Sequence, residues 1–223
     1  MEHPVTILSF LPEHIQLTYS HVLFTTVVVL LIVMLGFLTR RMTAEVPSNG
    51  QRAVEGLVDY LYDLGESVMG HEGSKYMPLI LAIGFYVAFS NLLGLLPGFG
   101  SPTMNMNSTA APAVCVFLFY QYLGFKRHGV GYIKHFLGPI WILAPLMFII
   151  ELIGHFARPL SLTMRLFGNV TGEEMVIAML FTLVPFLVPL PMYFLALFTG
   201  CLQAFVFMLL TMVYIGGALE EAH

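Results

Sequence analysis

Residues 138–185 of this 223-residue chain read GPIWILAPLMFIIELIGHFARPLSLTMRLFGNVTGEEMVIAMLFTLVP, an apolar stretch with charged side chains in its middle. As one helix it would be roughly 70 Å long at about 1.5 Å per residue, more than twice the hydrocarbon core of about 30 Å in a bilayer. The stretch therefore either breaks into two membrane spans near Pro159 or runs through the membrane at a steep tilt. A second long apolar stretch follows at residues 190–219.

The whole chain has the composition of a membrane protein. It is 58% hydrophobic and 10% charged, whereas soluble domains have about 45–50% apolar and about 25% charged residues. Nine Lys and Arg with thirteen Asp and Glu cannot cover the surface of a soluble domain of this length. The net charge of −4 has the wrong sign for a surface that neutralises phosphates, so no nucleic acid is expected as a partner.

The hydrophobic pattern predicts an all-α, multi-pass integral membrane protein with one membrane domain over residues 1–223. Before the stretch at 138–185, spans are expected at residues 20–39, 76–96 and 109–125. Ser108-Thr109, followed by Pro112, is predicted to cap the start of the third span. Arg40-Arg41 and Lys126-Arg127 follow the first and third spans, and the positive-inside rule places those ends in the cytoplasm. The N-terminus is then outside. Because the first apolar run has full spanning length, no cleavable signal is expected.

Residues 48–70 have a different pattern, that of an amphipathic helix on the cytoplasmic surface. Apolar residues repeat at helical spacing on one face, and acidic residues occupy another: Glu55, Asp59, Asp63 and Glu66. Since anionic lipid surfaces attract Lys and Arg, the acidic face favours contact with a protein partner. A merely solvated stripe of charge is the alternative.

Polar side chains within residues 138–185 share one helical face. At about 100° per residue, five of them lie within about 80° of Arg165: Glu151, His155, Arg158, Asn169 and Glu173. Glu174 falls nearly opposite, so the two adjacent carboxylates are expected in different surroundings. A charge in mid-membrane costs about 2.5–3.5 kcal/mol on insertion scales, which makes these residues functional candidates. Either Glu151, Arg158 and Arg165 pair with one another as structural glue, or the face is a cation path that a permanently charged arginine interrupts.

Two motifs resemble those of subunit a of the F-type (rotary) ATP synthase membrane sector. The run Arg158-Pro-Leu-Ser-Leu-Thr-Met-Arg165-Leu-Phe-Gly-Asn169 is similar to that family's most specific motif. The run Leu202-Gln203-Ala-Phe-Val-Phe-Met-Leu-Leu-Thr211-Met-Val-Tyr214-Ile is similar to its last helix. A weaker similarity covers Asn91-Leu-Leu-Gly-Leu-Leu-Pro97 and the following Ser101-Pro-Thr loop, and the order of elements matches over nearly the whole chain.

The resemblance implies that residues 138–185 and 190–219 form a long, tilted helical hairpin packed against a rotating ring of subunit c. The C-terminal tail, Glu220-Glu221-Ala-His223, is then cytoplasmic. The implied protein is the stator subunit of the proton channel. It offers two offset half-channels to the ring and couples proton translocation to ATP synthesis, without being an enzyme itself.

The resemblance also implies the partners and the location of the chain. Its partners are the subunit c ring, the peripheral stalk subunit b, the other ATP synthase subunits and the lipid bilayer. No cofactor is expected. The absence of a transit-like leader favours the plasma (inner) membrane of a bacterium.

The resemblance and the polar face of the helix together assign proton translocation to seven residues of this chain, of which Glu151 and His155 are candidates from the polar face alone: Arg165, Glu174, Glu173, Asn169, Gln203, Glu151 and His155. Arg165 separates the half-channels. Protons are expected to enter from outside past Asn169, Gln203 and one of the two glutamates, and to leave past Glu151 and His155. A plain helix-packing role is the alternative for His155.

The chain departs from the family pattern at two points. The family commonly has a Gly-Glu pair about nine residues after the arginine. An ungapped count reaches Glu174, whereas the carboxylate next to a glycine here is Glu173, so both stay candidates. The family loop Pro-Thr-x-Asp-x-Asn has Asn105 in place of the aspartate, which puts an acidic entrance to the outer channel in doubt at that point.

Other membrane functions find less support in the sequence. A secondary transporter usually shows inverted repeats, and none is visible. An intramembrane hydrolase needs a motif such as His-Glu-x-x-His or Gly-x-Ser-x-Gly, and both are absent. His128 and His135 lie in a basic loop without a second ligand set at suitable spacing, so no metal site is expected.

Overall fold

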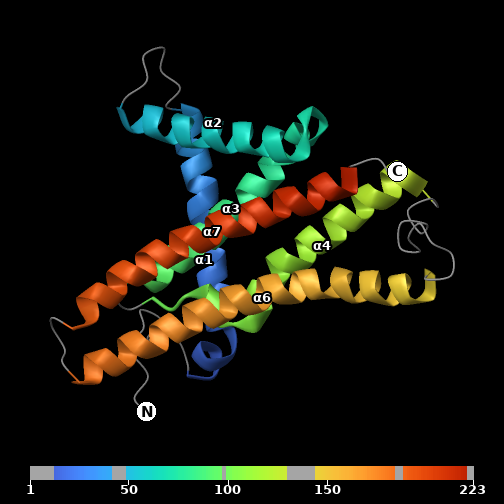
Figure 1. The fold of residues 1–223 in the computed structure, drawn as a ribbon. Coiled ribbons are helices and arrows are strands. Elements are labelled where there is room, and N and C mark those ends of the chain that lie inside the picture. Colours follow the sequence, from blue (N-terminus) through green and yellow to red (C-terminus); the bar gives the residue numbers. More distant parts are fainter. Residues whose placement is uncertain (1–12, 42–48, 97–98, 130–143, 184–187, 220–223) are drawn as a thin grey trace.

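The computed structural model describes residues 13–41, 49–96, 99–129, 144–183 and 188–219, and the long elements in these ranges are all α-helices (Figure 1). They are α1 (Glu13–Arg41), α2 (Asn49–Met69), α3 (Met77–Gly94), α4 (Met106–His128), α6 (Ala144–Leu183) and α7 (Pro189–Leu219), with short 3-10 helices η2 (His71–Tyr76) and η3 (Pro102–Met104). Within these ranges, five helices are long and apolar enough to cross a membrane. The prediction of an all-α, multi-pass membrane protein is confirmed.

The helices α6 and α7 form an antiparallel pair that dominates the molecule (Figure 1). The helix α6 runs for 40 residues with Pro159 inside it. The alternative in which this stretch breaks into two helices at Pro159 is therefore wrong for the described residues 144–183. Figure 1 shows that α6 is bent. Pro159 inside the helix lacks a backbone N–H donor, which is a common cause of such a bend. The helix α4 packs against α7 and against the part of α6 that precedes Pro159, where Phe117 meets Phe156 and Tyr120 meets His155.

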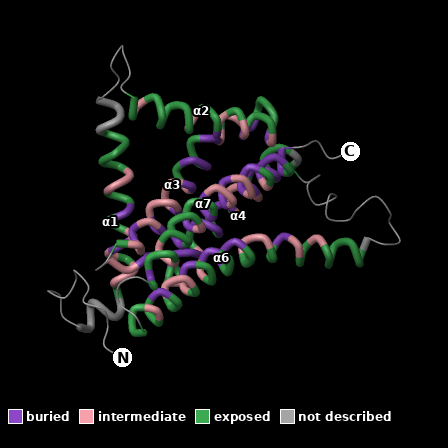
Figure 2. Tube along the Cα trace, turned by 60° about the vertical axis from the view of Figure 1, so that its left-hand side comes forward, coloured by how far each residue is buried: buried purple, intermediate pink, exposed green. Residues whose placement is uncertain are grey.

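The core of the bundle surrounds α7, which contacts α2, α3, α4 and α6. Figure 2 shows buried residues along α7 and α3, whereas α1 and much of α6 are exposed. Side chains such as Met77, Phe207 and Met212 are fully buried there. The exposed outer faces are rich in Leu, Val, Ile, Phe and Met, as expected for helices that meet lipid rather than water.

The helix α2 lies across one end of the bundle (Figure 1). It contacts the C-terminal part of α7, where Val68 O would come within 3.1 Å of a Cβ built on Gly216. Leu61 and Met69 are buried, and the four acidic side chains of the predicted polar face are exposed. Its location on a membrane surface stays a prediction.

The helix α4 begins at Met106, so the prediction that Ser108-Thr109 caps it was wrong. Asn105 is the N-cap, and its Oδ1 accepts a hydrogen bond of 2.9 Å from the backbone N–H of Asn107. Asparagine is among the best N-cap residues, because its side-chain oxygen can accept from a free amide in the first turn, here that of the second helical residue. The side chains of Arg40, Arg41 and His128, together with Lys134, His135 and the tail 220–223, lie outside the described residues.

The close approach of α3 to α7 generates a stability prediction. A Cβ built on Gly84 would lie 2.2 Å from Sδ and 2.3 Å from Cγ of buried Met208. Gly84→Ala should therefore destabilise the protein by about 1–3 kcal/mol through overpacking. Gly56→Ala on exposed α2, where nothing lies within 4 Å, should be neutral or stabilising by at most about 1 kcal/mol. Thermal unfolding of the purified variants measures the difference, and equal unfolding temperatures would contradict this account of the α3–α7 contact.

Candidate polar path through the helix bundle

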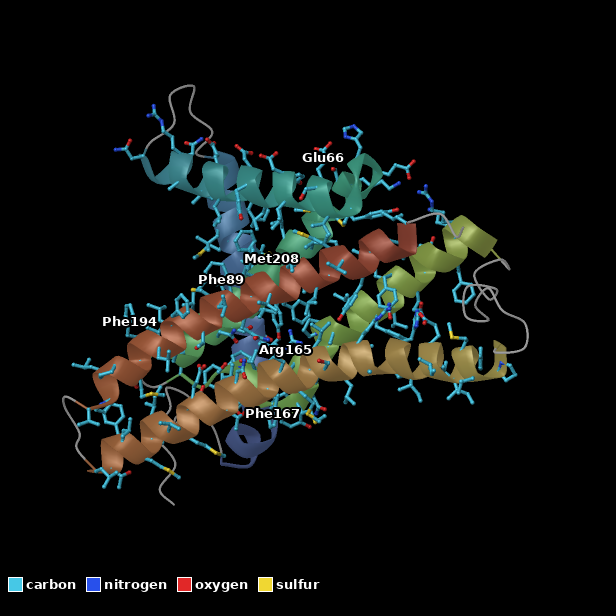
Figure 3. All side chains as sticks on the ribbon, in the orientation of Figure 1. Glu66, Phe89, Arg165, Phe167, Phe194 and Met208 are labelled. Carbon is cyan, nitrogen blue, oxygen red and sulfur yellow. The ribbon has the colours of Figure 1, made fainter. Side chains whose placement is uncertain are left out.

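Arg165 lies about midway along α6 (Figure 3) and its side chain is exposed on the bundle surface. Its Nη2 donates one long hydrogen bond of 3.4 Å to Ser161 Oγ, one turn earlier on the same helix. Among the described residues, Arg165 forms no ion pair with a carboxylate. Its guanidinium therefore carries a permanent charge that the chain itself barely engages.

Asn169 and Gln203 connect α6 to α7 one turn beyond Arg165. The Asn169 Nδ2 donates to the Gln203 Oε1 over 3.3 Å. Gln203 is 6% exposed, and its Nε2 has no hydrogen-bond partner in the described part of the chain. Since a buried amide donor without a partner is costly, this position suits a water molecule or a passing proton carrier.

Glu173 and Glu174 point into different surroundings, as their helical positions predict. Glu173 faces α7, where its Oε1 accepts a 2.6 Å hydrogen bond from the Thr199 hydroxyl. Glu174 faces α3 and the chain before η3. Its Oε1 lies 2.9 Å from where a Cβ on Gly94 would be, so only glycine leaves room there. That oxygen is buried without a hydrogen-bond partner in the described residues.

Hydrogen-bonded hydroxyl and amide groups continue from Glu174 toward α3. The carboxylate of Glu174 and the Cβ of Ser101 both lie close to the position that a Cβ on Gly94 would occupy. Ser101 Oγ and Thr103 Oγ1 are 2.6 Å apart. The Thr103 hydroxyl donates to Asn91 Oδ1 over 3.0 Å, and Asn91 Nδ2 donates to the Gly200 carbonyl over 3.2 Å.

A cavity of about 500 Å³ connects the two glutamates. It lies between α3, α6 and α7, near the end of the bundle where α6 connects to α7. Both carboxylates line it, together with Asn91 and apolar side chains such as Phe181 and Tyr193. A volume of this size holds several waters, because one water occupies about 30 Å³ in the liquid.

Glu151 and His155 lie on the other side of Arg165, toward the start of α6. His155 is 4% exposed, and its Nδ1 is 3.0 Å from the Glu151 carbonyl oxygen and 3.6 Å from Glu151 Oε1. Glu151 precedes Arg165 by about 21 Å of helix and Glu174 follows it by about 14 Å. The predicted site residues therefore form two groups with the arginine between them, and they do not form one cluster.

Arg158 separates the Glu151–His155 pair from Arg165. Its Cζ lies 5.9 Å from the ring centre of Tyr120 on α4 and 5.3 Å from that of Tyr214 on α7. Within the described residues, Glu151, Arg158 and Arg165 form no ion pairs with one another. The interpretation of these three as mutually paired structural glue is therefore wrong.

Sequence reasoning missed several groups that the structure brings to this path. Thr199 and Tyr120 carry no recognisable motif, and they reach α6 only because distant helices pack together. Asn91 and Ser101 lie in the two segments that weakly resemble the family. That resemblance was the available sequence signal for these two residues. In the described ranges, no group of three or more His, Cys, Asp or Glu could hold a metal ion.

Comparisons with known proteins agree on one family. The family model described as "ATP synthase A chain" matches residues 22–216. The chain is 49% identical to "ATP synthase subunit a 3" of Pelobacter propionicus and 46% identical to "ATP synthase subunit a" of Trichlorobacter lovleyi. It is 45% identical to "ATP synthase subunit a" of Geobacter sulfurreducens. Each of these alignments covers 100% of both chains.

The cavity generates a prediction on water access. In a chain whose Cys115 and Cys201 are replaced by alanine, Ala178→Cys should react readily with a membrane-impermeant thiol reagent, since residue 178 lines the cavity. Met179→Cys, on the same turn but outside the cavity lining and 67% exposed on an apolar surface, should react far more slowly. A thiol in a dry apolar environment is neither ionised nor reached by the reagent. Equal rates at the two positions would contradict a water-filled cavity.

Proposed function

We propose that this chain, which belongs to the ATP synthase A chain family, presents two offset half-channels to a rotating ring of subunit c. As a member of that family it is the membrane proton-channel subunit of an F-type ATP synthase. It is not catalytic by itself. The membrane and the other ATP synthase subunits are its surroundings. The family resemblance noted in the sequence is thereby confirmed.

The observation that carries the proposal is the guanidinium of Arg165, which is exposed and forms no ion pair with a carboxylate of the described residues. A charge in a membrane-spanning segment is retained only with water, a partner or a function. Three residues near it on the exposed face of α6 are small: Ser161, Gly168 and Gly172, with nothing within 4 Å of a Cβ on either glycine. Small residues let a second helix approach closely in a membrane. This face of α6 therefore suits the outer helices of a ring that bear ionisable carboxylates.

The inlet half-channel is the cavity that holds Glu173 and Glu174. Protons pass from it through the amide pair Asn169–Gln203 to the ring carboxylate beside Arg165. The outlet half-channel contains Glu151 and His155, where the ring releases its proton after rotation. The two half-channels do not meet, because they lie on opposite sides of Arg165 along α6.

Arg165 couples the proton to rotation. Its positive charge favours the deprotonated form of the ring carboxylate that faces it, and its own proton stays bound. A reprotonated carboxylate is neutral and can move into lipid. Each proton that crosses a potential of 100 mV contributes about 2.3 kcal/mol. The ring therefore turns in the direction that the proton gradient sets.

The orientation follows from the basic residues. The ends of α1 and α4 and the whole of α2 lie in the cytoplasm, the N-terminus lies outside, and the C-terminus is cytoplasmic. The chain forms one membrane domain in a bacterial plasma (inner) membrane. The acidic face of α2, with Asp59 and Asp63 exposed, is available to a protein of the stator such as peripheral stalk subunit b.

Substitution of Arg165 tests the proposal directly. Arg165→Ala should abolish ATP synthesis and ATP-driven proton pumping in an assembled complex, because it removes both the barrier and the partner of the ring carboxylate. Arg165→Lys should also be severely impaired, since an ammonium lacks the planar fork and loses its proton more easily when desolvated. Subunit assembly, ATP synthesis and ATP-driven acidification are all measured on the same preparation of membrane vesicles. An assembled Arg165→Ala complex that still makes ATP would overturn the proposed function.

The two glutamates should differ when each is replaced. Glu174→Gln should impair proton pumping strongly, because Glu174 lines the cavity and the amide of a glutamine cannot bind and release a proton as a carboxylate does. Glu173→Gln should be milder, since an amide oxygen can still accept from Thr199. ATP-driven acidification of vesicles measures both. Near-normal pumping in both variants would rule out a carboxylate inlet at this position.

A further inference from the structure

Arg158 is the second arginine of α6 within the bundle, and it is held in a different way from Arg165. Its guanidinium lies near the faces of two aromatic rings, Tyr120 of α4 and Tyr214 of α7, which we call the tyrosine clamp. Tyr120 is 2% exposed, and its ring is also 5.8 Å from that of Tyr214. An aromatic face attracts a cation within about 6 Å through its quadrupole, which offsets part of the cost of burying the charge.

The tyrosine clamp holds the charge of Arg158 without neutralising it. The two rings are uncharged, and Arg158 forms no ion pair with a carboxylate among the described residues. Arginine does not lose its proton in proteins. Arg165, by contrast, is exposed on the face of α6 proposed to meet the ring, where a carboxylate can pair with it and cancel most of its field.

Arg158 is also placed between Arg165 and the outlet half-channel. It precedes Arg165 by two turns and lies within about 20° of it around the helix, which is about 10 Å along the axis. His155 and Glu151 follow in the direction of the outlet. Pro159 comes next in the chain, so the clamp ties the bend of α6 to α4 and α7.

We propose that Arg158 is a second proton barrier, a permanently fixed positive charge that keeps the outlet half-channel closed to the inlet while Arg165 is paired with a ring carboxylate. The inference rests on the proposed function, because it needs Arg165 to face the ring. When a carboxylate neutralises Arg165, the repulsion that excludes hydronium ions from this part of α6 weakens. Arg158 supplies the same repulsion at that moment, since its half-buried charge is held against rings of α4 and α7 and is not exposed like that of Arg165.

The test is passive proton conductance in vesicles that carry the assembled complex, driven by a potassium diffusion potential. Arg158→Met keeps most of the side-chain length but removes the charge, and it should raise conductance about tenfold. Arg158→Lys places an ammonium against the two aromatic faces, which favour its charged form, and should stay within about twofold of the unmodified complex. Conductance of Arg158→Met within twofold of the unmodified complex would overturn the proposal. Equal leaks in the Met and Lys variants would also overturn it, because packing rather than charge would then be decisive.

A second pair of variants carries the test if Arg158→Met fails to assemble. Tyr214→Phe keeps the aromatic face and should keep conductance low, whereas Tyr214→Leu releases the charge and should raise conductance. Tyr122→Leu is the matched control on α4, because Tyr122 is exposed and its ring lies near Lys126 instead of Arg158. Equal conductance in the Phe and Leu variants would overturn the proposal.

The two claims fail in different ways. An assembled Arg165→Ala complex that still supports ATP synthesis would disprove the proposed function. Normal proton conductance in the Arg158→Met complex, together with an inactive Arg165→Ala complex, would disprove only the claim that Arg158 is a second barrier.

Discussion

A permanent positive charge on a membrane-spanning helix is the constraint on which the rest of this structure depends. The guanidinium of Arg165 cannot lose its proton, and within the described chain it makes only one long hydrogen bond, to Ser161. Such a group is expensive in hydrocarbon unless water or a partner reaches it. The polar groups on either side of Arg165 admit water, and the nearby small residues Ser161, Gly168 and Gly172 leave room for a partner helix. Both features are surroundings that this charge requires.

The helix packing keeps those surroundings in two separate places. One group, around Glu174, opens into a cavity between α3, α6 and α7. The other, around His155, is buried against α4, with the ring of Tyr120 6.0 Å away. Because both groups lie on the single helix α6 with Arg165 between them, they stay apart along the helix axis. In the proposed mechanism a proton leaves this chain to pass between them, and this makes rotation of a ring obligatory.

Much of this was predictable from residues on a single helix. Composition and apolar run length predicted the multi-pass helical fold, and 100° per residue predicted that Glu173 and Glu174 have different neighbours. Contacts between helices were not predictable, because nothing in the local pattern pairs Thr199 with Glu173 or Tyr214 with Arg158. The prediction that Ser108-Thr109 caps α4 was wrong because Asn105 precedes them, is a stronger cap and has a free backbone amide within reach.

Disulfide cross-linking between this chain and subunit c tests the central claim most directly, since it asks which face of α6 the ring covers. A cysteine at Ser161, exposed one turn before Arg165, should cross-link to a cysteine placed one turn from the ion-binding carboxylate of subunit c. A cysteine at Leu166, which is 0% exposed against the bundle, should not. Cross-linking from Leu166 as strong as that from Ser161, or none from Ser161 in an assembled and active complex, would contradict the account.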